Sequence, residues 1–166
     1  MTGLVFAGSE TLAPTFTSPA ASGVFTASSF AIDFTLPELA RSGKVQMVIS
    51  RTGGAADGAG DRTLVFSSSF EVAGNHAVSI PSIAAAGSLA AVASISPASD
   101  LVDGAIYTAT LSYEDSVGNA ASTVAHTGIV YAGSATIMPS ISSPSAGAAI
   151  ATDFSIVRWL IHLCAC

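Results

Sequence analysis

The stretch 101-LVDGAIYTATLSYEDSVGN-119 contains the clearest secondary-structure signal in the chain. Residues 107–114 alternate between two faces, one of which carries Tyr107, Ala109, Leu111 and Tyr113. Alternation with a period of two predicts a half-buried β-strand over this range. Residues typical of turns stand on both sides of it, with Asp103-Gly104 before the strand and Asp115 to Asn119 after it.

Shorter runs with the same period predict further strands, over residues 30–36, 44–50, 63–68, 76–80 and 121–131. Turn signals rich in Gly, Asn, Asp and Pro separate these runs. Segment 83–96 is ambiguous, because apolar residues spaced by three favour a helix while Gly87 and the nearby Pro81 and Pro97 would shorten it. We expect a helical turn or a short strand there. Several short strands with regular turns predict an all-β fold, an antiparallel β-sandwich.

The chain also contains an internal repeat. Residues 3–19 read GLVFAGSETLAPTFTSP and residues 128–144 read GIVYAGSATIMPSISSP, so nine of 17 positions are identical without a gap. The offset of 125 residues predicts three pieces of a tandem array. Residues 1–9 are then the last strand of a preceding repeat, residues 10–134 a complete repeat, and residues 135–166 the truncated start of the next.

The third piece departs from the first after Ile156. Residues 157–166 read VRWLIHLCAC and contain the one tryptophan and both cysteines of the chain. We interpret this tail as not native to the array. Cys164 and Cys166 are too few for a metal site, and a bridge between them would be strained.

Composition excludes some classes of partner. Charged residues make up 10% of the chain, and the formal net charge is −6 with Lys44 as the one lysine. A protein that holds nucleic acid through its phosphates needs many basic side chains, so we expect no nucleic-acid partner. The late apolar stretch 154–166 is shorter than the roughly 20 residues of a membrane span, so we expect no membrane insertion. Met1 is not followed by a signal-peptide pattern.

The spacing of Asp103-Gly104, Tyr107-Thr108, Asp115 and Gly118-Asn119 resembles the late strands of Ig-like and fibronectin-type-III-like modules. Such modules stand in tandem in bacterial and algal surface proteins and adhesins. The resemblance implies an Ig-like antiparallel β-sandwich of Greek-key topology, located outside the cell or on its surface. It also implies a non-enzymatic structural or adhesive role. The expected partners are neighbouring repeats of the same chain and a cell-surface protein or glycan.

Two roles compete for the marked polar residues. In the structural interpretation, Asp103 and Gly104 form a turn, and Asp115, Gly118 and Asn119 form the next one. Tyr107 then buries its ring and caps a backbone group with its hydroxyl, as a tyrosine corner does. In the alternative, Asp100, Asp103 and Asp115 supply hard oxygen ligands to Ca²⁺, which would be the one cofactor.

Other patterns point to no chemistry. Residues 53–61 are faintly similar to a calcium-binding nonapeptide, but sites of that kind need stacked copies, so we expect a flexible loop. His76, His126 and His162 lack the spacing of a metal site. The chain has no GxSxG elbow and no GxxxxGK[ST] loop. We therefore expect no enzyme. The alternative function is a calcium-dependent adhesin, or a carbohydrate-binding module attached to a secreted enzyme.

Overall fold

The computed structural model describes residues 8–26 and 30–133, which belong to one compact unit that ends at Ala135. The fold is all-β, because strands and two short 3₁₀ turns account for its regular structure. The elements are β1 (Thr15–Ser18), β2 (Val24–Thr26), β3 (Phe30–Leu36), β4 (Gln46–Gly54), β5 (Arg62–Phe66), η1 (Ser68–Phe70), β6 (Gly74–Ile80), η2 (Ala86–Ser88), β7 (Val92–Ser96), β8 (Ala105–Tyr113) and β9 (Ser122–Ala132).

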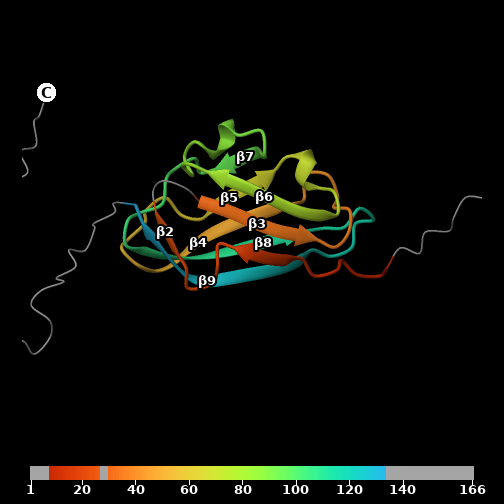
Figure 1. The fold of residues 1–166 in the computed structure, drawn as a ribbon, viewed down its shortest axis with the longest axis horizontal. Coiled ribbons are helices and arrows are strands. Elements are labelled where there is room, and N and C mark those ends of the chain that lie inside the picture. The colour runs from red at the N-terminus through yellow and green to blue at the C-terminus, as the bar shows by residue number, and fades with distance from the viewer. Residues whose placement is uncertain (1–7, 27–29, 134–166) are drawn as a thin grey trace, which may run out of the picture. The chain divides into compact units, whose positions relative to one another are not determined.

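The strands form two sheets (Figure 1). The smaller sheet has the order β1-β3-β6, and the larger has the order β2-β9-β8-β4-β5-β7. Strand β8 lies in the middle of the larger sheet, paired with β4 on one side and β9 on the other. Strand β7 returns to the edge beside β5 after β6 has crossed to the smaller sheet.

The expectation of a purely antiparallel sandwich is wrong at one pair, since β2 runs parallel to β9. The cause lies in the link between β1 and β2. Pro19 has no N–H to continue the ladder with β3, and the chain crosses to the larger sheet. There Ser22 N–H donates to Thr127 O (2.8 Å) and Gly23 O accepts from Val130 N–H (2.9 Å). The chain keeps its direction through the crossing, so β2 meets β9 in parallel.

Five strands predicted from alternation, β3, β5, β6, β8 and β9, lie within about two residues of the expected ranges. Strand β4 continues to Gly54, four residues beyond the expected range of 44–50. Segment 83–96 contains both of the structures weighed for it, the 3₁₀ turn η2 and then strand β7. Of the strand predicted in residues 1–9, residues 1–7 lie outside the described residues, and residues 8 and 9 belong to no strand. The predicted third piece, residues 135–166 with its tail 157–166, also lies outside them.

The core lies between the two sheets and follows the alternation. On β3 the buried residues are Phe30, Ile32, Phe34 and Leu36, and on β8 they are Ala105, Tyr107, Ala109, Leu111 and Tyr113. Phe34 of the smaller sheet packs against Phe66 of the larger one, with ring centroids 5.3 Å apart. Residues of both sheets therefore share one apolar layer.

The described chain enters this unit at one end and leaves it at the other (Figure 1). We call "entry end" the end where the Ala40–Asp115 bridge lies and where residues 8–12 approach. We call "exit end" the opposite end of β8, where Asp103 and Gly104 meet the last residues of β9. Among the described residues, no helix is long and apolar enough to cross a bilayer.

Substitution of Leu111 by Ala is expected to destabilise the fold by about 3 kcal/mol, because Leu111 is fully buried and its truncation leaves a cavity. Leu39→Ala is the matched control, since Leu39 is 51% exposed and its truncation is expected to cost less than about 0.5 kcal/mol. Urea unfolding of both variants measures the difference. Equal losses would contradict the described core.

Candidate functional site

A buried ion pair joins the loop between β4 and β5 to the larger sheet near the exit end. Arg62 of β5 and Asp57 of the loop both have side chains that are 1% exposed, and Arg62 Nη1 contacts Asp57 Oδ2. Three of the remaining guanidinium donors reach backbone carbonyls, those of Gly60 (2.8 Å), Ser99 (3.3 Å) and Asp100 (2.5 Å). Four of the five N–H donors of Arg62 are therefore used inside the fold.

Tyr107 belongs to the same network. Its ring is fully buried, and its hydroxyl donates to Asp57 Oδ2 (2.7 Å) while it accepts from the backbone N–H of Val102 (2.9 Å). Asp57 Oδ1 accepts from the N–H of Ala59 (3.0 Å). The loop that the sequence led us to expect as flexible is thus anchored in the interior through one carboxylate.

The electrostatics of this network favour a permanent charge pair. Burial alone would raise the pKa of Asp57, but hydrogen bonds from Arg62 and Tyr107 outweigh it and bring the pKa from 3.8 down to about 2. Burial raises the pKa of Tyr107. Asp57 is therefore ionised and Tyr107 protonated at neutral pH. Both carboxylate oxygens of Asp57 accept hydrogen bonds. This arrangement holds a loop and is unsuited to proton transfer at neutral pH.

Two of the candidate metal ligands, Asp100 and Asp103, lie at the exit end and accept hydrogen bonds from neighbouring loops. Asp100 Oδ1 accepts from Ser82 Oγ (2.7 Å) and from the N–H of Ala84 (3.0 Å), and these bonds lower the pKa of Asp100. Asp103 Oδ1 accepts from the N–H of Gly133, 2.8 Å away. Gly104 has a positive φ of 75°, as the turn into β8 requires.

The third candidate, Asp115, organises the turn at the entry end. It is 3% exposed, and its Oδ1 accepts from the N–H groups of Val117, Gly118 and Asn119 at 3.1, 2.8 and 3.0 Å. Its Oδ2 accepts from Asn119 Nδ2 (2.5 Å). Burial acts to raise the pKa of Asp115, and the hydrogen bonds from Asn119 and its neighbours lower it below its usual value.

Tyr113 plays a part at the entry end that the sequence analysis did not assign. Its hydroxyl donates to the carbonyl of Leu12 (2.6 Å) and lies 3.2 Å from Glu38 Oε1. Glu38 Oε1 also accepts from the N–H of Leu12 (2.7 Å). Burial, together with the charge of Glu38, raises the pKa of Tyr113 well above its usual range. Residues 8–12 are therefore held to the end of β8 before β1 begins.

The structure does not bring the three calcium candidates together. Asp100 and Asp103 lie at the exit end and Asp115 at the entry end, with the nine residues of β8, roughly 30 Å, between them. Within residues 8–26 and 30–133, no three His, Cys, Asp or Glu side chains are grouped as metal ligands would be.

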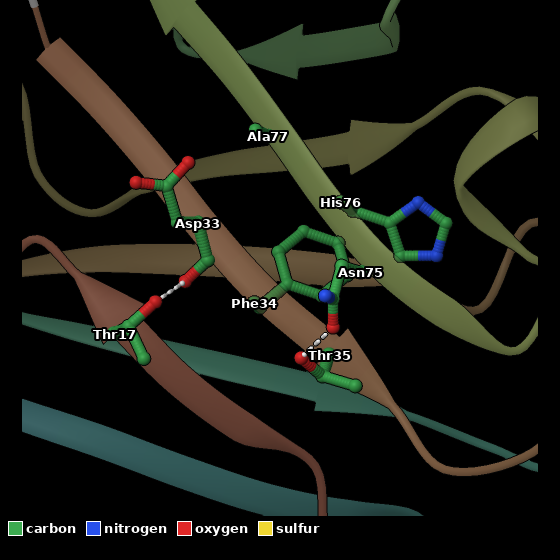
Figure 2. A pocket seen from close by; sticks show the side chains of 7 residues that line it. All are labelled: Thr17, Asp33, Phe34, Thr35, Asn75, His76 and Ala77. Atoms are coloured by element: carbon green, nitrogen blue, oxygen red, sulfur yellow. Dashed lines mark hydrogen bonds between the residues drawn. The ribbon is translucent and has the colours of Figure 1, made fainter.

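A hollow with a volume of about 350 Å³ lies on the smaller sheet (Figure 2). It is lined by Thr17, Asp33, Phe34, Thr35, Asn75, His76 and Ala77. Both hydroxyls of this lining are engaged within the sheet: Thr17 Oγ1 donates to Asp33 O (3.1 Å) and Thr35 Oγ1 to Asn75 Oδ1 (2.7 Å). The hollow pairs no nucleophile with a base, since none of its hydroxyls is bonded to His76.

The described histidines are held by aromatic and backbone contacts. His76 Nε2 lies 2.8 Å from Val72 O, and the His76 ring contacts Phe34 and Phe70, each with centroids 5.1 Å apart. His126 stacks on Phe16 at 4.6 Å, and its Nδ1 lies 2.6 Å from Pro19 O. His162 lies outside the described residues.

Asp57 and Arg62 were missed by the sequence analysis, although one signal was available. Arg62 has the same phase as Leu64 and Phe66, which places it on the buried face of β5. A charge on a buried face needs a partner. Which residue becomes that partner depends on how the loop folds back, and the local sequence pattern does not predict this.

The Asp57–Arg62 pair is expected to make the free energy of unfolding fall at acidic pH. The pKa of Asp57 is lower in the folded chain, so its contribution to stability is present above about pH 4 and is lost as the pH falls toward 2. A shift of this size corresponds to about 2 kcal/mol. Asp57→Asn should make the pH dependence of the free energy of unfolding shallower in this window. It should also cost about 3 to 5 kcal/mol at neutral pH, because Arg62 is left unpaired.

The control for this prediction is Asp61→Asn, four residues further along the same loop at an exposed position. Chemical unfolding between pH 2 and pH 7 compares the two variants. If Asp57→Asn retained the acid dependence of the parent chain, the ion pair would not be the cause of it.

Calcium is expected to leave the melting temperature unchanged, because both oxygens of Asp115 are occupied by donors of its own turn. A site filled a hundredfold above its Kd would add about 2.7 kcal/mol of stability. Melting in millimolar Ca²⁺ and in a chelator measures the difference. A rise that disappears in Asp115→Ala would establish a calcium site at this turn.

Comparison of the chain with protein-family models, with curated proteins and with solved structures found no match in any of the three.

Proposed function

We propose that this chain carries a non-enzymatic Ig-like module that works as a load-bearing spacer in a tandem-repeat protein outside the cell or on its surface. The observation that carries the proposal is the parallel pairing of β2 with β9. These are the strands through which tension along the chain would pass. The separation of the chain's entry and exit at opposite ends of the unit supports the same role.

Parallel pairing determines how tension acts on the hydrogen bonds. Val24, Phe25 and Thr26 face Val130, Tyr131 and Ala132. Once residues 8–12 and β1 have separated from the end of β8 and from β3, force would reach β2 from its amino end and β9 from its carboxyl end. The two neighbours would then be pulled in opposite directions along their length. The bonds between them lie across this direction and would be loaded together. A pair loaded in this way resists more than a pair opened one bond at a time.

The use of the buried polar groups also supports a structural role. Asp57, Arg62, Tyr107, Tyr113 and Asp115 are engaged with the backbone or with one another. Enzymes instead keep perturbed acids and bases poised toward a cleft. Here such groups hold loops and turns at the two ends of the sandwich.

The internal repeat of 125 residues supports the tandem arrangement. Each copy of a spacer module adds length to the protein. Copies linked in one chain also bind a partner more tightly together than one copy does, because linkage gives a high effective concentration. The Ig-like assignment rests on the resemblance of residues 103–119 and on a pair of sheets in which the first two strands, β1 and β2, belong to different sheets. We propose neighbouring repeats as the main partners, with a cell-surface protein or glycan as a further one.

Force spectroscopy on the full chain, held by its two ends, tests this function. Residues 8–133 are expected to unfold in one abrupt step that lengthens the chain by about 400 Å. Val130→Pro removes the N–H that donates to Gly23 O and should lower the unfolding force. Leu64→Ala destabilises the core without touching β2 or β9 and serves as the control, with a smaller loss of force expected at equal equilibrium stability. Gradual extension at low force in the parent chain would contradict a load-bearing role.

A further inference from the structure

Gly8 and Gly133 occupy the same position in the two copies of the repeated stretch, and they are bound at opposite ends of the unit. The carbonyl of Gly8 accepts from Asn119 Nδ2 (2.9 Å) at the entry end. The N–H of Gly133 donates to Asp103 Oδ1 (2.8 Å) at the exit end. In an array with this repeat, the glycine that closes one copy is the glycine that opens the next. One residue then carries both bonds.

We propose that consecutive repeats are joined through this single glycine with no linker between them, so that the exit end of one copy docks on the entry end of the next. The inference rests on the tandem arrangement in the proposed function. The nitrogen and carbonyl oxygen of one residue lie within about 4 Å of each other. Asp103 of one copy and Asn119 of the next are therefore held within about 10 Å, which brings the two ends into contact.

A side chain at Gly133 would require the ring of Tyr131 to shift. A Cβ built on Gly133 would lie 2.6 Å from Cε1 and 3.0 Å from Cζ of Tyr131. Tyr131 is half-buried and packs against the core, and its backbone carbonyl accepts from Gly104 N–H (2.8 Å), so a shift of its ring would disturb the exit end. A side chain at the joint would therefore change the surface on which the next copy docks. Both copies of the repeated stretch have glycine here.

The entry end offers an apolar surface for the docked neighbour. Of the five large apolar side chains that are exposed among the described residues, four lie at this end: Leu12 (50%), Leu39 (51%), Val72 (51%) and Val117 (59%). Backbone bonds bring them together around the Ala40–Asp115 bridge, since Leu39 O accepts from Ser116 N–H and Glu71 O accepts from Ala40 N–H.

Exposed apolar groups gathered in one place mark a surface that becomes covered. The occupant follows from the joint. The glycine that begins the unit is bonded at this same end, so the body it would bring there is the exit end of the preceding copy. We call these four side chains the entry patch. In the array they are buried between copies, whereas in a single unit they face water.

A duplicated chain tests the joint: residues 1–132 followed directly by residues 8–166, so that the second Gly8 takes the place of Gly133. Residual dipolar couplings measure the orientation of each copy. The two copies are expected to share one alignment tensor, as a rigid pair does. Insertion of Gly-Ser-Gly before the second Gly8 is expected to give two different tensors.

A matched substitution separates docking from local stability. Leu39→Ser in the second copy lies at the joint and is expected to lower the melting temperature by about 3 °C. The same substitution in the first copy has no preceding unit against it and is expected to shift the melting temperature by less than about 1 °C. Equal shifts from the two copies would overturn the entry patch as a docking surface.

The outcomes distinguish this inference from the proposed function. Two folded copies that tumble independently would overturn the joint and leave the spacer role standing. A second copy that fails to fold while the first one folds would contradict the repeat unit, and with it the proposed function. A shared tensor that survives the insertion would also overturn the joint, because the glycine would then not be what holds the copies.

Discussion

Two buried hydroxyls on one strand organise both ends of this protein. Tyr107 and Tyr113 face the core from β8, six residues apart, and each ring is fully buried. A hydroxyl taken out of water must find a partner. Tyr107 finds Asp57 and Val102 at the exit end, and Tyr113 finds Leu12 at the entry end. The central strand therefore fixes the loops at both ends as well as the core between them.

Arg62 extends this constraint into the larger sheet. A guanidinium without a partner in the interior would cost several kcal/mol, so the loop after β4 folds back to present Asp57 together with carbonyl oxygens. The same carboxylate accepts from Tyr107, which couples β5, the loop and β8 in one network. Such a network contributes more to a unique arrangement of loops than to total stability, since its gain is offset by desolvation.

Local pattern predicted some parts of this fold and not others, for physical reasons. Strands β3, β5 and β8 bury one face, and β6 and β9 alternate half-buried with exposed positions, so all five show a period of two in the sequence. Strands β1 and β2 have four and three residues, too few for a period to be recognised. The parallel pairing of β2 with β9 joins residues about a hundred positions apart. The motif identified turn residues such as Asp115. It did not identify Asp57, because Asp57 has a role only once Arg62 is buried.

Two residues of the repeated stretch, Val130 and Gly133, make contacts that bear on both the proposed tension and the proposed joint. Val130 donates to Gly23 and so links the last strand to the second one. Gly133 leaves the room that Tyr131 occupies and bonds to Asp103. Both residues recur at the start of the chain, as Val5 and Gly8. In the proposed array, this stretch would close one copy and open the next, so its residues would have to fit both. Tension would then pass from the β2–β9 pair of one copy into the next through a joint as short as the backbone allows.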